Sequence, residues 1–463
     1  MTKNIGLLCT STLLALCLSS FAKAENEGVT KDVATRNHEG WKIDWNGYTE
    51  LDSFYDSTRT FTEQSNNAPI TPPGTAGGGG DSGRTQMSVR QSRLIMRLGM
   101  PDAEGWKMRG YFEGDFLGFD PTPGNATVVQ SEQNFYMAPT FRLRQFYAEV
   151  SNNGWTFKVG QGWSIFGWQP YYELLNTSTA APIGLIQRNP LVQGSKKMDI
   201  GPIGTEAAVA VARPTQKDST IPNIDLAYRL TWDGRKSGTQ NWSGTDYKLV
   251  PTSLAISGTL RQFSAPNSDG NVADKTSYMG GAVALSAQVP IITAAALDNI
   301  KNSVTFTGEI VNGNGIGDNY VGWTGGLSAM ATGAGTGAFG MSNNLYPNLD
   351  NGIAGYDSSG NFQLVQFQEF TAQLQYILPF EMHSNISVSY GRLHSPNVGN
   401  LAAGTAGVSA NAYDTQELYS VSYWADLTDH IRTVLEYDHM LTHYTNNTYP
   451  SNNRYGVSVL YIF

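Results

Sequence analysis

The chain has 463 residues, with 30 Lys and Arg against 39 Asp and Glu, and only 15% of its residues are charged, against about 25% in a soluble globular protein. It is rich in Gly (50) and Tyr (23), yet only 40% hydrophobic. The net charge of −9 and the absence of long Lys/Arg runs exclude a basic nucleic-acid-binding protein. This composition favours either a loose low-complexity chain or an all-β protein with one apolar and one polar surface.

Residues 1–24 have the features of a cleaved signal peptide. Lys3 gives a positive start, residues 5–18 are largely apolar, and residues 22–24 have the small-x-small form that signal peptidase cleaves. The apolar run is shorter than the roughly 20 residues of a transmembrane helix. Cys17 leaves a lipoprotein signal as the alternative.

Cys9 and Cys17 are the two cysteines, and both lie in this segment. The mature chain is therefore expected to contain no disulfide, Cys metal site or Cys nucleophile. No later stretch reaches 18 consecutive apolar residues, so the chain is expected not to cross a membrane with helices. Residues 25–40 are polar and are predicted to be a short periplasmic tail.

The last ten residues, RYGVSVLYIF, alternate in the manner of a β-strand. One face holds Tyr455, Val457, Val459, Tyr461 and Phe463. Lipid-facing and lumen-facing residues alternate in this way in outer-membrane barrels. We therefore predict the closing strand of a barrel, and we expect this face to be the assembly signal read by the barrel-assembly machinery.

Similar alternation recurs upstream and predicts sixteen strands. They lie at 41–55, 85–99, 105–117, 139–150, 154–163, 185–197, 204–212, 222–233, 251–264, 276–288, 301–311, 362–378, 383–393, 412–424, 429–441 and 453–463. Fourteen or eighteen strands remain alternatives, because Pro190 interrupts one segment and 204–212 is short. The predicted fold is an all-β, transmembrane antiparallel β-barrel over residues 41–463.

The connections assign the two ends of this barrel. Bacterial barrels have short periplasmic turns and longer outside loops. With the first strand starting inside, the long segments 56–84, 164–184 and 312–361 all become outside loops. Segment 234–250 is long for an inside turn.

Basic residues fall on the polar faces of several predicted strands, although the chain as a whole is acidic. They are Arg93, Arg97, Lys107, Arg109, Arg142, Arg144, Lys158, Arg229 and Arg261. The alternation slips by one residue before Phe146, so a bulge or a register change is needed to keep Arg142, Arg144 and Glu149 all inside. A lumen lined by Arg favours anions and rejects cations, because guanidinium forks match carboxylates.

A structural interpretation of these bases remains open. Barrel interiors also pair Arg with acids, and six acids are available on the same faces: Glu113, Asp115, Glu149, Asp225, Glu309 and Glu369. We expect part of the basic set to be neutralised in this way and the remainder to bias the pore toward anions.

The third outside loop is a candidate constriction. Such loops fold into the lumen of trimeric porins, and this one offers Phe166, Trp168, Tyr171, Tyr172 and Glu173. Alternatively it packs against a neighbouring subunit or caps the outer face.

Enzymatic motifs are absent. The six His show no HExxH spacing, and there is no GxSxG elbow or P-loop. A Ser/His pair like that of an outer-membrane phospholipase could use His430 or His439 but has little support. We expect no enzyme activity, catalytic residue, metal or cofactor.

Several motifs resemble one family. They are RQSRL (90–94), EGDF (113–116), FRLRQFYAEV (141–150), GWTFKVGQGWSIF (154–166), GEIVNGNGIGDNYVG (308–322) and Phe463. Together they resemble the DcaP-like trimeric porins of Gram-negative bacteria, over most of the mature chain but patchily between about 320 and 410. The resemblance implies a sixteen-stranded homotrimer that admits small anionic solutes, including dicarboxylates. Arg93, Arg97, Arg109, Arg142 and Arg144 are the matching basic positions, and the N-terminal coiled coil of some members is missing.

The sequence therefore predicts an exported outer-membrane porin for passive diffusion of small, preferentially anionic solutes. Its expected partners are these solutes, the lipid bilayer with its lipopolysaccharide, and further copies of the chain. The alternative is a structural or adhesive barrel whose long loops bind a host or matrix partner.

Overall fold

The computed structural model describes residues 36–38, 40–61, 63, 69–75, 77–118, 140–168, 184–215, 219–232, 238–242, 245–249, 252–266, 275–293, 301–320, 352–357, 359, 361–380, 383–404 and 412–463. The signal-peptide segment 1–24 and most of the expected tail 25–40 lie outside these residues. Within the tail, β1 (Arg36–His38) pairs with the start of the first wall strand.

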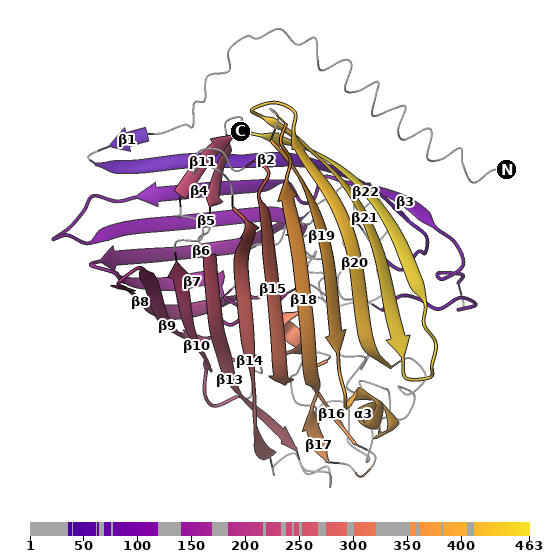
Figure 1. Ribbon diagram of the computed structural model, residues 1–463. Coiled ribbons are helices and arrows are strands. Elements are labelled where there is room, and N and C mark those ends of the chain that lie inside the picture. Colours follow the sequence, from indigo (N-terminus) through magenta and orange to yellow (C-terminus); the bar gives the residue numbers. More distant parts are fainter. Residues whose placement is uncertain are drawn as a thin grey trace.

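The chain forms a closed antiparallel barrel of sixteen wall positions (Figure 1). Each strand pairs with its neighbours in sequence, and the last strand pairs with the first from Tyr48↔Ile462 to Asp56↔Arg454. The wall consists of β2 (Trp41–Asp56), β3 (Arg84–Ser88) with β4 (Arg93–Gly99), β5 (Lys107–Gly118), β6 (Thr140–Asn152), β7 (Trp155–Trp163), β8 (Arg188–Ile200), β9 (Ile203–Ala212), β10 (Asn223–Trp232), β13 (Thr252–Pro266), β14 (Lys275–Ile292), β15 (Val304–Asn314), β18 (Gln366–Ile377), β19 (Ser384–His394), β20 (Tyr413–Asp426), β21 (Ile431–Tyr444) and β22 (Ser451–Ile462). The predicted count of sixteen is confirmed.

Two predicted strands are interrupted. Segment 85–99 is split into β3 and β4 by a turn at 89–92, in which the Ser92 N–H bonds the Val89 carbonyl. Segment 362–378 is split into β17 (Phe362–Leu364), which pairs with β16 (Ala354–Tyr356), and the wall strand β18. Alternation of side chains does not reveal such breaks, because the residues on both sides keep the same period.

The two ends of the barrel differ in their connections. At the turn end, β6 and β7 are joined by Asn153–Gly154, both at positive φ (45° and 78°), as expected of an Asn-Gly hairpin. The long segment 234–250 at this end contains a small hairpin of β11 (Gly238–Trp242) and β12 (Thr245–Leu249). The opposite end, called the loop end, carries loop 1 (57–83), loop 3 (164–187) and loop 6 (315–365). Figure 1 shows β16, β17 and α3 (Val398–Gly404) at this end.

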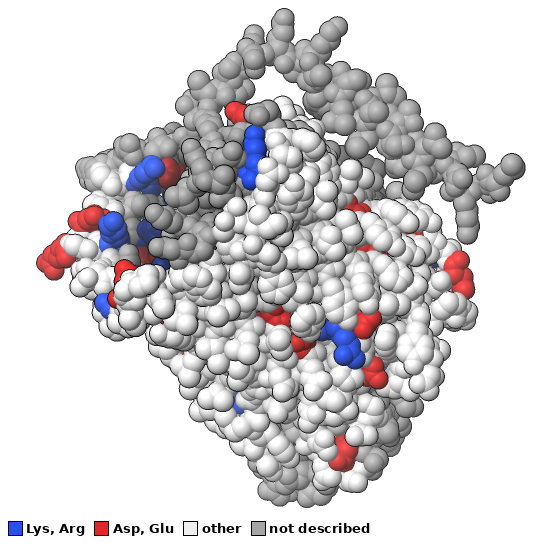
Figure 2. All heavy atoms as spheres, viewed as in Figure 1, with Lys and Arg blue, Asp and Glu red and all other residues white. Residues whose placement is uncertain are grey.

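The outward face of the wall is apolar. Apolar side chains at alternate strand positions are exposed there, such as Leu51, Phe157, Val192, Leu226 and Ile310, and Figure 2 shows few charged side chains over the visible wall. The predicted assembly-signal residues lie on this face: Tyr455, Tyr461 and Phe463 are exposed and Val457 and Val459 are half-exposed. This surface matches the apolar band of a membrane barrel. Among the described residues, no helix is long and apolar enough to cross a membrane.

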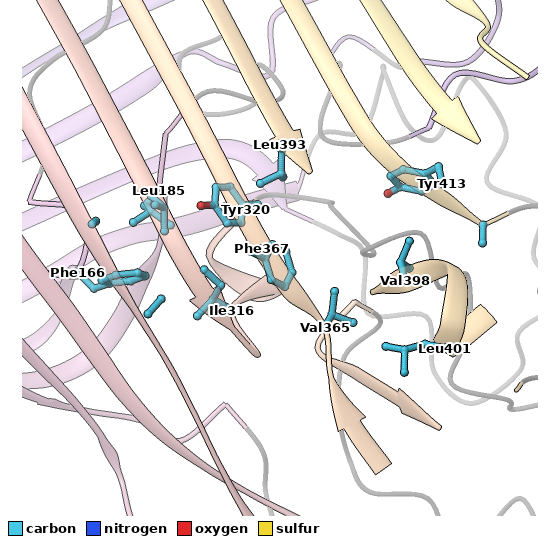
Figure 3. Close-up of a cluster of buried hydrophobic side chains, with 14 of the residues drawn as sticks. Phe166, Leu185, Ile316, Tyr320, Val365, Phe367, Leu393, Val398, Leu401 and Tyr413 are labelled. Atoms are coloured by element: carbon cyan, nitrogen blue, oxygen red, sulfur yellow. The ribbon is translucent and has the colours of Figure 1, made fainter. Parts of the chain in front are cut away.

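The largest apolar cluster of the described residues lies at the loop end, inside the barrel wall (Figure 3). It joins Phe166 and Leu185 of loop 3 to Ile316 and Tyr320 of loop 6. The same cluster includes Phe367 of β18, so loop residues are packed on the inner wall and not only above the rim.

Candidate solute pathway

The expected irregularity in β6, a bulge or a register change, is a bulge at Arg144. Glu113 of β5 pairs with Gln145, but the next residue, Gly114, pairs with Leu143, which leaves Arg144 as an extra residue. Because a bulge opposes two residues to one, Phe146 stays on the outward face while Arg142 and Arg144 reach carboxylates inside. The slip in the alternation was therefore a valid signal.

These arginines form a network with two acids of β5. Arg142 donates two hydrogen bonds to Asp115, at 2.9 and 2.6 Å. Arg144 bonds both Glu113 and Asp115 and is buried. The Arg93 Nε lies 3.5 Å from the Glu113 Oε1. Three guanidinium groups thus share two carboxylates in this network.

Nearer the turn end, the basic side chains are more exposed. Arg109 pairs with Glu149, and Arg229 donates a 2.6 Å hydrogen bond to Glu206. The Lys158 ammonium lies 4.6 Å from the Tyr147 ring centroid. The remaining predicted bases at this end, Arg97 and Lys107, are both exposed.

Arg261 does not line an open surface. Its buried guanidinium bonds Asp318 and Asn319, both in the short 3-10 helix η1 (Gly317–Asn319) of loop 6. It also donates a 3.3 Å hydrogen bond to Gln187 of loop 3. The prediction that Arg261 lines the pore is therefore corrected: Arg261 holds loops 3 and 6 together. Its partners in these loops are distant in the sequence, so alternation along the strand could not reveal them.

Two basic residues of β8 were missed. Lys197 is 65% exposed and lies 4.0 Å from Glu206. Lys197 lies two residues after Ser195 and four after Gln193, on the same inward face of β8. The alternation of side chains along the strand could therefore have identified it as a lumen residue. The Arg188 guanidinium lies 5.0 Å from the centroid of the Trp163 ring, and within the described part of the chain its buried Nη1 has no hydrogen-bond partner. Pro190 obscured the strand at this point.

Loop 3 enters the barrel at both of its described ends. The Ser164 hydroxyl donates a 2.9 Å hydrogen bond to Asp225 of β10, and the Gly167 N–H bonds the Ser257 hydroxyl of β13 at 2.9 Å. Asp225 and Ser257 are buried, whereas their apolar neighbours along the strands, such as Leu226 and Ile256, are exposed on the outward face. Both acceptors therefore face the lumen. Phe166 is buried, and Trp168 lies under the Arg229 guanidinium at 4.3 Å. Tyr171, Tyr172 and Glu173 lie outside the described residues, so the constriction they would form stays a prediction.

The far end of loop 3 is held by two buried carboxylates. The Gly184 N–H donates to Glu369 of β18 and the Leu185 N–H to Glu309 of β15, each at 3.0 Å. Tyr320 of loop 6 also donates its hydroxyl proton to Glu369, at 2.7 Å. Burial and then the nearby Glu369 carboxylate raise the pKa of Tyr320 well above its usual range, so this hydroxyl remains a donor. Of the six acids expected to pair with Arg, Glu309 and Glu369 instead anchor a loop.

Comparison with solved structures identifies the architecture. The DcaP outer-membrane channel of Acinetobacter baumannii aligns with a TM-score of 0.63 over 92% of this chain and 99% of that one, at 15% identity. The chain has the fold of this channel. The anion-selective porin of Comamonas acidovorans gives a TM-score of 0.50 over 91% and 100% of the two chains, at 9% identity. The predicted DcaP-like architecture is confirmed, whereas no family model and no curated protein matches the sequence.

The metal and Ser/His sites considered from the sequence can be checked in the described residues. No group of three or more His, Cys, Asp or Glu there could hold a metal ion. His430 bonds the Ile462 carbonyl and His439 bonds Asn453. Neither ring makes a hydrogen bond with the hydroxyl of a described Ser residue.

Proposed function

We propose that this protein is an outer-membrane porin through which small hydrophilic solutes diffuse passively, with a preference for anions such as carboxylates and dicarboxylates. The apolar outward wall, the polar inner wall and the DcaP-like fold support a membrane channel. The loop end would face outside and the turn end the periplasm, as the lengths of the connections indicate.

The difference in exposure between basic and acidic lumen residues carries the anion preference. The side chains of Arg109 and Lys197 are 67% and 65% exposed, whereas their carboxylate partners Glu149 and Glu206 are each 11% exposed. A solute passing this wall therefore meets cations first. Exposed guanidinium and ammonium groups lower the barrier for anions and raise it for cations.

We further propose that the channel is a homotrimer. Outward-facing rings of β5 and β6 pack together, with Phe112 and Phe141 stacked at 6.1 Å and Phe146 edge-on to Phe112. Gly114 makes room for the Phe141 ring. A patch of packed aromatic rings on the outward face suits close contact with a second copy.

Planar-bilayer recording of the purified mature protein tests this proposal. A trimer should insert in three equal conductance steps, and the reversal potential in a KCl gradient should show that chloride is more permeant than potassium. Succinate added to one side should carry current or reduce the chloride current. A cation-selective channel refutes the anion preference, and a barrel with no conductance favours the structural or adhesive alternative.

A further inference from the structure

The lumen contains an acidic surface that solutes do not meet. It consists of Glu50, Asp52 and Asp56 on β2 and Glu436 and Asp438 on β21, here called the acidic strip, and all five side chains are buried. β22 lies between these strands and presents Arg454, which pairs in register with both Asp56 and Asp438. Among the described residues, none of Glu50, Asp52 and Asp438 is in an ion pair with a basic side chain. Uncovered, this strip would attract cations.

Loop 1 covers the loop-end part of this strip. The Phe61 ring lies 5.5 Å from the Arg454 guanidinium, on the lumen side of β22. Arg454 also donates a 3.1 Å hydrogen bond to the Glu63 carbonyl. The Glu63 carboxylate in turn accepts a 2.6 Å hydrogen bond from Arg90, in the turn between β3 and β4. Both Phe61 and Glu63 are buried, so they are packed against the wall.

A second contact holds the loop farther along. Ile70 is 1% exposed, its N–H bonds the Thr442 hydroxyl at 3.0 Å, and its carbonyl accepts from the Tyr444 hydroxyl at 2.9 Å. Thr442 and Tyr444 belong to β21, which also carries Glu436 and Asp438. Loop 1 is thus fixed to the inner side of the strands that carry the acids.

We propose that loop 1 sets the ion selectivity of the channel by shielding the acidic strip, so that the exposed bases of β4–β10 dominate the pathway. This inference rests on the proposed anion-preferring porin. It places a selectivity determinant on β2, β21 and β22, directly beside the basic strand β4, which pairs with β2. Loss of a neutral loop contact should therefore weaken the anion preference although no charge changes.

The test removes the two apolar anchors of loop 1. Phe61→Ala/Ile70→Ala deletes buried side chains without altering any charge. Ile353→Ala/Leu364→Ala is the matched control, since it truncates two buried apolar residues of loop 6 in a separate cluster. All proteins are first checked for the heat-dependent gel shift of a folded barrel. The ratio of chloride to potassium permeability is then measured from reversal potentials, and carboxyl accessibility from labelling with a water-soluble carbodiimide and glycine methyl ester, followed by peptide mass spectrometry.

In the wild type, Asp52 and Asp438 should be labelled far less than exposed carboxylates such as Asp102. In Phe61→Ala/Ile70→Ala, their labelling should rise and the chloride-to-potassium ratio should fall several-fold, while the loop 6 control retains both wild-type values. Adding Asp438→Asn should restore part of the anion preference in the loop 1 variant and change the wild type little.

The wild-type permeability ratio tests the proposed function, and the change in this ratio in the loop 1 variant tests the inference. A cation-selective wild type overturns the proposed function and the inference with it. An anion-selective wild type whose ratio is unchanged when Asp52 and Asp438 become labelled overturns the inference alone. Ready labelling of these two residues in the wild type also overturns it, whether or not the variant folds.

Discussion

Arg454 in the last strand of the barrel holds Asp56 at the end of the first wall strand through two parallel hydrogen bonds. Nε lies 2.9 Å from Oδ1 and Nη2 lies 2.8 Å from Oδ2, and both side chains are buried. The pair joins residues 398 positions apart. It therefore fastens the seam at which the barrel closes.

Loss of this pair should destabilise the barrel more than loss of an exposed one. We expect Arg454→Ala to lower the free energy of unfolding by about 3–5 kcal/mol, because it leaves a buried charge without its partner. The control Arg392→Ala removes a pair with Glu417 whose Arg is 46% exposed, and such pairs contribute about 0–1 kcal/mol. Urea unfolding in lipid vesicles, followed by tryptophan fluorescence, measures both. Equal losses for the two variants would contradict the seam role.

Gly47 is a second requirement of the seam. Its N–H and carbonyl exchange hydrogen bonds of 3.1 Å with the backbone of Phe463. A Cβ at this position would lie 2.3 Å from the Arg93 carbonyl oxygen and 3.1 Å from the Phe463 ring. Gly47→Val should therefore cost at least the roughly 1–3 kcal/mol of overpacking and reduce the folded fraction on refolding.

Gly99→Val supplies the comparison for Gly47. A Cβ on Gly99 meets no atom closer than 3.6 Å, from the Lys42 side chain, so this variant should refold like the wild type. The folded fraction is read from the unheated band on a gel. A Gly47→Val protein that refolds as well as Gly99→Val would show that the seam opens to accept the side chain.

The wall was predictable because alternation between lipid and lumen constrains every second residue. Even the bulge at Arg144 was visible, since the slip before Phe146 breaks a strict period. The loops were not predictable in the same way. Ile70 lies beside Pro- and Gly-rich sequence without periodicity, and nothing local indicates that its backbone bonds Thr442, 372 positions away.

The roles of charged residues were only partly predictable for a related reason. Alternation along a strand predicts which bases share a face with the inward carboxylates, and the structure pairs Arg93 with Glu113 and Arg109 with Glu149. Whether a base meets solutes depends on its partner, which can come from any loop. Arg261 faces inward, but its guanidinium is paired with the Asp318 carboxylate of loop 6.

The exposed and buried arginines of the pore should differ in their effects on selectivity. Arg109 is exposed, whereas Arg144 is buried between Glu113 and Asp115. A unit charge 4 Å from an ion in water contributes about 1 kcal/mol, or about fivefold in local ion concentration. Arg109→Gln should therefore reduce the chloride-to-potassium permeability ratio by up to about this factor. Arg144→Gln should chiefly lower stability, because it leaves two buried carboxylates with one fewer partner.

Reversal potentials and unfolding curves recorded on the same preparations separate these effects. Arg229→Gln, whose side chain is 26% exposed, should fall between the two in selectivity. A selectivity loss that is larger for Arg144→Gln than for Arg109→Gln would contradict the view that exposure decides which bases act on solutes.

The carboxylates that anchor loop 3 should affect how often the open channel closes in single-channel recordings. Glu309 and Glu369 accept the N–H groups of the adjacent residues Leu185 and Gly184, and an intramolecular hydrogen bond contributes about 0.5–1.5 kcal/mol. Glu309→Ala/Glu369→Ala should free this end of the loop from the wall, so that closures in single-channel recordings become more frequent. Thr307→Ala, which truncates a buried inward residue of β15, is the control. A closure frequency equal to that of the control would show that the remaining contacts of Phe166 and Leu185 suffice to hold the loop.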